Sequence, residues 1–80
     1  MQQEKEIMCT NIPISYFTNC NYKDLENKLK KHIQSIYLSD WGHCKLEDIE
    51  YITLGIICDR EDAHKVKELN LLKIIENELL

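Results

Sequence analysis

Four cysteines and three histidines are the side chains best suited to hold a metal ion or to act as a nucleophile and its base. They are Cys9, Cys20, Cys44, Cys58, His32, His43 and His64. Structural zinc sites usually draw their ligands in close pairs such as Cys-x-x-Cys, because two ligands on one turn are ordered together. Here only His43 and Cys44 are neighbours, and a site that combines them with Cys20 or Cys58 stays open. This scatter predicts neither a bound metal nor a cofactor.

Catalysis by a Cys–His pair would also need an orienting group and an oxyanion hole. No glycine-rich stretch supplies them. Carboxylates flank the apolar segment 49–58, but the ends of such a strand lie about 30 Å apart, too far for one catalytic dyad. These carboxylates are Glu47, Asp48 and Glu50 around the start of the segment and Asp59, Glu61 and Asp62 after its end. We therefore expect no catalytic residue and no enzymatic activity, with a metal- or thiol-dependent enzyme as an alternative.

Basic residues concentrate in one predicted helix, at Lys23, Lys28, Lys30 and Lys31. These side chains are able to contact phosphates, which makes a nucleic-acid-binding regulator a second alternative. The net charge of −4 and the presence of a single arginine, Arg60, disfavour it, since proteins that bind nucleic acid are usually basic and use arginine to contact bases. We expect nucleic acid not to be the partner.

The length of 80 residues predicts a single small domain over 1–80, with the polar residues 1–6 frayed. A chain of this size buries roughly 60% of its unfolded surface. The sequence shows no signal peptide and no apolar stretch near the roughly 20 residues that cross a bilayer. We expect a cytoplasmic protein, not associated with a membrane, whose cysteines are free thiols.

The elements that would position these side chains follow from the apolar spacing. The β-branched and aromatic content of 7–17 predicts a strand, and the segment 22–38 predicts a helix with Asn21 as its N-cap. The apolar stripe of this helix is Leu25, Leu29, Ile33 and Ile36. The segment 49–58 predicts a second strand with apolar groups on both faces, although a helix over 47–57 stays open.

The segment 61–80 predicts helix, entered at Asp59 with Asp62 completing a capping-box-like pair. Its apolar residues form two stripes that point to nearly opposite sides of a straight helix. Either the helix breaks near Asn70, so that both halves face one core, or it continues and its second half packs on another chain.

These elements predict an α+β fold, a small two-layer strand–helix–strand–helix domain, with dimerisation as one way to complete it. Two strands alone are marginal in water, so a homodimer is expected more than a monomer. The C-terminal half-helix carries more apolar surface than one small core takes easily, and Trp and Tyr are enriched at binding hot spots. We expect a protein partner, bound by Tyr37, Trp41, Leu72, Ile75 and Leu79.

The function expected from the sequence is that of a small acidic, non-enzymatic protein-binding module, a regulator, adaptor or inhibitor of another protein. The lysine- and isoleucine-rich, alanine-poor usage resembles that of proteins from AT-rich bacteria and their phages. This compositional resemblance implies a phage or bacterial accessory protein that acts against a host defence or regulatory enzyme.

Overall fold

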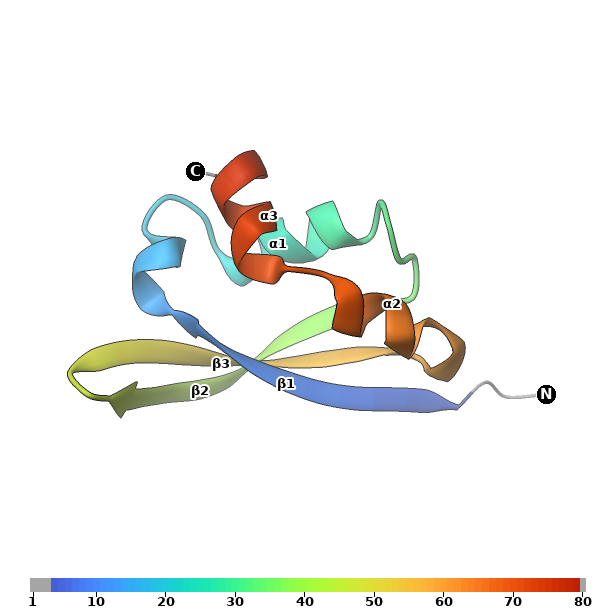
Figure 1. The fold of residues 1–80 in the computed structure, drawn as a ribbon, viewed down its shortest axis with the longest axis horizontal. Helices are drawn as coiled ribbons and strands as arrows, with labels where there is room; N and C mark the ends of the chain where they lie inside the picture. Colours follow the sequence, from blue (N-terminus) through green and yellow to red (C-terminus); the bar gives the residue numbers. More distant parts are fainter. Residues whose placement is uncertain (1–3, 80) are drawn as a thin grey trace.

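A three-stranded antiparallel sheet forms one layer of the molecule, and the helices form a second layer over one of its faces (Figure 1). The computed structural model describes residues 4–79. The strands are β1 (Lys5–Pro13), β2 (Tyr37–Leu46) and β3 (Ile49–Asp59), and the helices are α1 (Tyr22–Leu29), α2 (Ala63–Glu68) and α3 (Leu71–Glu78). Short 3₁₀ turns span Ile14–Phe17 and Arg60–Asp62. The expected small α+β domain is confirmed, and none of the helices described is long and apolar enough to cross a bilayer.

Strand β3 is central, with β1 and β2 antiparallel on either side of it. The strand predicted over 49–58 is confirmed, and the helical alternative over 47–57 is wrong. A two-residue turn joins β2 to β3, and Glu47 and Asp48 both take the left-handed conformation there, with φ of 51° and 67°. This conformation gives a hairpin connection the twist of the flanking strands.

The N-terminal segment predicted to be frayed, 1–6, is too long. Strand β1 starts at Lys5 and therefore includes the last two residues of that segment. Residues 1–3 lie outside the described part.

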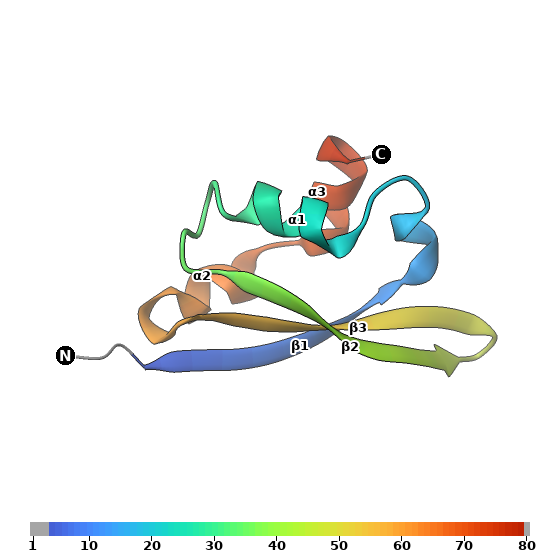
Figure 2. The ribbon, with the colours of Figure 1, turned by 180° about the vertical axis from the view of Figure 1, so that it is seen from behind.

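The first predicted helix is correct at its start and wrong at its end. Asn21 caps α1, accepting hydrogen bonds from the backbone N–H groups of Lys23 and Asp24, and the Asp24 carboxylate accepts one from the N–H of Asn21. The helix ends at Leu29 rather than at residue 38, and β2 follows after a loop (Figure 2). The first strand also ends earlier than predicted, at Pro13, because the chain turns into a 3₁₀ segment over Ile14–Phe17.

The C-terminal helix predicted over 61–80 breaks near Asn70, as the first of the two alternatives expects. Helix α2 ends at Glu68, Leu69 and Asn70 are extended, and the Asn70 side chain caps α3 by accepting from the N–H of Lys73 at 3.2 Å. The capping box predicted at the entrance is wrong. Asp59 and Asp62 make no side-chain capping bond, and α2 begins only at Ala63.

The hydrophobic core lies between the helix layer and the sheet. Its buried members are Ile12, Leu25, Leu29, Ile33, Ile36, Leu38, Ile52, Leu54, Ile56, Cys58, Ala63, Val66 and Ile75. The C-terminal apolar residues join it, since Ile75 is fully buried and Leu71, Leu72, Ile74 and Leu79 are half-buried against it. A single chain therefore covers most of the apolar stripe that the sequence suggested would need a second chain.

Candidate functional site

The face of the sheet that turns away from the helices carries most of the large hydrophobic residues that are exposed in the described part of the chain. Alternate side chains of a strand point to opposite faces, so the pairing register assigns each residue to a face. Large exposed hydrophobic residues on the face without helices are Ile7, Tyr37, Trp41, Leu46 and Ile49. Their exposed fractions run from 49% at Ile49 to 63% at Ile7. We call this surface the open face.

The register joins these residues across the strands. Ile7, Ile57 and Tyr37 are direct cross-strand neighbours, which makes one apolar row on the open face. The Lys30 ammonium lies 4.4 Å from the ring centroid of Tyr37, a cation–π distance that restrains the ring at one side of the row. Toward the hairpin, Leu46 and Ile49 pair and form a second apolar contact.

Trp41 lies between these two groups because of an irregularity in β2. The pairing with β3 shifts between Asp40 and Gly42, and Gly42 has a φ of 126°, a conformation that favours glycine. The indole ring lies directly over Gly55 of the central strand, where a Cβ would overlap the ring atoms. Trp41 is nevertheless 50% exposed. One side of the ring is therefore held by the sheet, and much of its surface remains available for contact.

The structure separates the five residues predicted to bind a partner into two groups. Tyr37 and Trp41 lie on the open face, in strand β2 rather than at a helix end. Leu72, Ile75 and Leu79 belong to the helix layer on the other side of the sheet, and Ile75 has no exposed surface. The two groups do not form one site, and burial in the core explains the apolar character of the second group.

The sequence prediction missed Ile7, Leu46 and Ile49 as members of the exposed surface. The available signal was the second apolar face of the segment 49–58, where Ile49, Tyr51 and Ile57 alternate with the core residues. The predicted fold contained helices for only one face of a sheet. An apolar residue on the other face therefore had no element in the chain to cover it.

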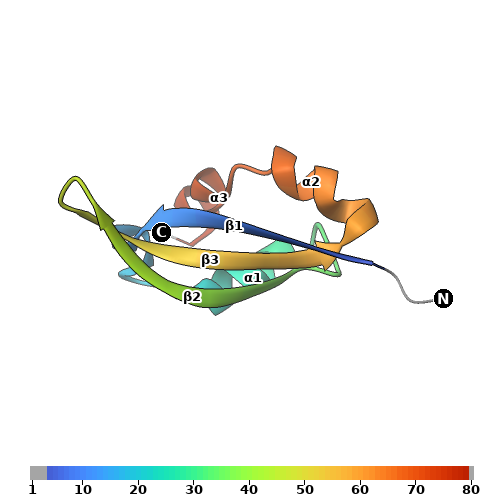
Figure 3. The same ribbon diagram turned by 90° about the horizontal axis from the view of Figure 1, so that it is seen from below.

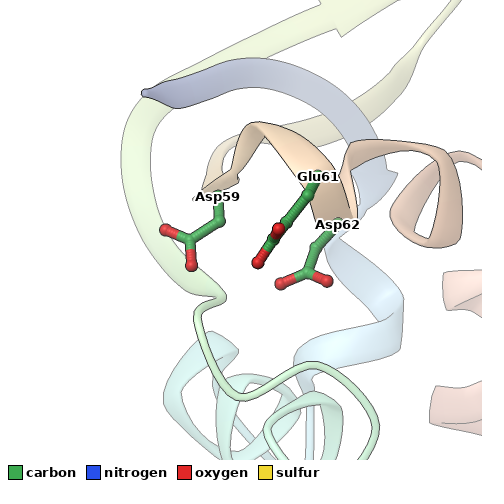
Figure 4. A group of neighbouring side chains, drawn as sticks. All are labelled: Asp59, Glu61 and Asp62. Atoms are coloured by element: carbon green, nitrogen blue, oxygen red, sulfur yellow. The ribbon is translucent and has the colours of Figure 1, made fainter. Parts of the chain in front are cut away.

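The acidic residues beside the end of β3 are the one group of potential metal ligands that come together within residues 4–79. They are Asp59, Glu61 and Asp62 (Figure 4), and each offers a ligand oxygen within 4.8 Å of those of the other two. Two of the three already have protein partners. Asp59 pairs with Lys5 at 2.5 Å, and Asp62 accepts from the Ser35 hydroxyl at 3.0 Å. The first bond joins β1 to the end of β3, and the second joins the loop before β2 to the turn after β3, so both have a structural role.

The thiols are placed differently from one another, and no disulfide joins them. Cys9 is exposed on the open face, whereas Cys58 is buried in the core. Burial raises the pKa of the Cys58 thiol, with a smaller contribution from the nearby Asp62 carboxylate. Burial also raises the pKa of Cys20. Neither thiol has the lowered pKa that activates a nucleophilic cysteine.

Comparison with protein families, curated proteins and solved structures gives no match for this chain. The functional argument therefore depends on the surfaces of the molecule itself.

Proposed function

We propose that the protein is a non-enzymatic protein-binding module that acts on a protein partner through the open face. The observation that carries this proposal is that Ile7, Tyr37, Trp41, Leu46 and Ile49 are all exposed on the one face that lacks helices. Large apolar and aromatic residues exposed together on one face mark interaction sites in small proteins. A protein that binds another protein and catalyses no reaction would act as a regulator, an adaptor or an inhibitor of that partner.

The chemistry of the open face defines the partner surface. Its large exposed residues are apolar or aromatic, the Asn11 amide oxygen accepts from the Thr53 hydroxyl, and the Lys5 ammonium at the margin is paired with Asp59. A matching partner presents an apolar patch with little charge, since an unpaired charge would lose its hydration on docking. Trp41 is the expected anchor because tryptophan is enriched among residues that dominate binding energy. A single strand of nucleic acid would stack on the same aromatics, but the net charge of −4 opposes a polyanion.

The test compares binding of Trp41→Ala and Tyr37→Ala with binding of the wild type. The partner is first captured with the wild-type chain and is then purified, so that affinity is measured in solution by calorimetry. We expect each substitution to weaken binding by about 2 kcal/mol, the size typical of a hot-spot residue. His64→Ala, at an exposed position of α2 in the helix layer, is the matched control and should bind like the wild type.

Light scattering of the wild-type chain decides whether the occupant is another protein or a second copy. A mass of twice 9.5 kDa that falls to one chain in Trp41→Ala would make the open face a homodimer interface. If binding and mass are both unchanged in Trp41→Ala and Tyr37→Ala while both variants remain folded, the proposal is wrong. A salt-dependent complex with single-stranded RNA, lost in Trp41→Ala, would support the nucleic-acid alternative instead.

A further inference from the structure

The two edges of the sheet differ in how well they are protected. Strand β1 forms one edge, and its pairing with β3 is regular over all nine residues from Lys5 to Pro13. Strand β2 forms the other edge, and it is interrupted by the irregularity between Asp40 and Gly42. Such interruptions prevent a further strand from pairing with an edge. Only the β2 edge has this protection along its centre.

A buried carboxylate gives the β2 edge a second protection. Glu26 of α1 is only 7% exposed, and its Oε1 accepts a hydrogen bond from the backbone N–H of Leu38 at 2.8 Å. Since Leu38 lies on the edge strand, this bond occupies an outward donor that an added strand would use. No comparable side chain caps the middle of β1 in the part of the chain that the structure describes.

The register shows which groups of β1 point outward. The backbone N–H of Arg60 donates to the carbonyl of Glu4 at 2.9 Å, so that pair bonds directly between the strands. Bonded and non-bonded pairs alternate along an antiparallel ladder. The even-numbered residues of β1 therefore bond to β3, and Ile7, Cys9 and Asn11 direct their N–H and C=O groups away from the sheet. These groups form a regular row of donors and acceptors.

A groove with a mainly apolar lining, which also includes Lys67 and Asn70, runs beside this row. It has a volume of about 490 Å³, and consecutive residues Met8 to Ile12 line it along one side. Because consecutive residues point to both faces of the sheet, the groove follows the backbone edge. The opposite wall comes from Val66 of α2, Leu69 of the connection between the helices, and Leu71 and Leu72 at the start of α3. Seen from below the sheet, α2 and α3 extend past β1 on the side away from β3 (Figure 3).

We propose that the β1 edge binds an extended segment of a partner protein, which adds a fourth strand beneath α2 and α3. A strand about 4.8 Å beyond β1 would satisfy the outward groups of Ile7, Cys9 and Asn11. Its alternate side chains would enter the groove between β1 and the α2–α3 connection. On the β1 side, the helix layer extends beyond the three-stranded sheet, and the added strand would occupy the space beneath this overhang. The bound segment therefore alternates apolar residues, directed into the groove, with residues directed to the open face.

A second copy of the chain fits this edge less well. Antiparallel pairing of β1 with its symmetry mate would keep both helix layers on the same side of the joined sheet. Each α2–α3 segment extends past its own β1, so the two segments would compete for the space above the paired strands. A short extended segment with no helix layer of its own avoids this conflict.

The proposal rests on the protein-binding function and specifies how the partner is held. Its test selects displayed random nine-residue peptides on the immobilised protein and then measures synthetic peptides in solution. We expect peptides that alternate apolar and polar residues. Their binding should weaken about tenfold or more in Cys9→Pro, because proline removes an outward N–H and its ring obstructs the added strand. The matched control is His43→Pro, which removes an outward N–H at the β2 edge and should leave binding unchanged.

Amide hydrogen exchange of the wild type provides a readout that needs no variant. Addition of a selected peptide should slow exchange at Ile7, Cys9 and Asn11. Three results would contradict the proposal. The selection yields no peptide, the selected peptides bind Cys9→Pro and the wild type equally, or exchange at these amides is unchanged. A wild-type dimer that dissociates in Cys9→Pro would identify a second copy as the occupant and would also contradict it. Peptide binding should persist in Trp41→Ala, so this proposal and the open-face proposal can fail separately.

Discussion

At the scale of single residues, Trp41 and Gly55 depend on one another. The indole covers the central strand at the position where any other residue would place its Cβ. Glycine weakens a strand interior, because it lacks a side chain to pack and loses more freedom on folding. An aromatic ring laid over the glycine restores packing at that point. The pair fixes the orientation of the ring that we propose as the anchor.

This dependence predicts a non-additive pair of substitutions. Gly55→Ala should lower the free energy of unfolding by about 1–3 kcal/mol, the usual effect of overpacking, because its Cβ displaces the ring. The same substitution in a Trp41→Ala background should have little effect or should stabilise, since the clash is absent. Urea unfolding of both single variants and the double variant measures the coupling. Equal effects of Gly55→Ala in the two backgrounds would contradict the contact.

At the scale of elements, Glu26 connects α1 to the edge strand β2. Its Oε1 accepts the Leu38 N–H, and its Oε2 lies 3.9 Å from the ammonium of Lys23. A buried backbone N–H left without a partner lowers stability by about 1–3 kcal/mol. The carboxylate therefore both holds the helix on the sheet and closes one position of the β2 edge.

Substitutions of Glu26 should distinguish the contribution of its packing to stability from the contribution of its hydrogen bond to Leu38. Glu26→Leu keeps an apolar stem but removes the acceptor, so we expect a loss of about 2 kcal/mol in urea unfolding. Glu26→Gln retains an amide oxygen that can accept from Leu38 and should lose less. A variant Glu26→Leu as stable as Glu26→Gln would show that the hydrogen bond does not hold the edge. The Leu38 amide should also exchange faster in Glu26→Leu.

The missed strand β2 shows which elements the sequence predicts poorly. Ile33 and Ile36 continue the helical spacing of α1, yet they reach the same core from a loop after the helix has ended at Leu29. The residues of β2 show no clean alternation, because one face is open and the strand is interrupted at Gly42. The turn at 47–48 lacks the Asn-Gly pair that usually marks a hairpin. By contrast, the capping residue Asn21 and the β-branched residues of the central strand are local signals, and both predictions are confirmed.

At the scale of the whole molecule, the sequence indicates more apolar residues than one small core can bury, but it does not indicate which of them the fold covers. The residue types of Tyr37 and Trp41 predict contact residues, and the structure places both on an exposed face. The unbalanced apolar stripe predicts contacts at Leu72 and Leu79, and the break at Asn70 turns that stripe toward the core. Which surface stays open depends on the third strand and on the break, which are properties of the complete fold.

The last helix should therefore be essential for the stability of the single chain. Ile75 is fully buried and joins α3 to the core, so Ile75→Ala should reduce the free energy of unfolding by about 2–5 kcal/mol. Domains of this size have only about 5–15 kcal/mol in total, so much of the fold would be lost. Leu79→Ala, at a half-buried position of the same segment, is the matched control and should lose less. Urea unfolding at several protein concentrations measures both effects. If midpoints rise with concentration and Leu79→Ala abolishes that rise, the C-terminal segment packs on a second chain, which is the second of the two alternatives drawn from the sequence. We expect instead midpoints that do not depend on concentration and a large loss in Ile75→Ala.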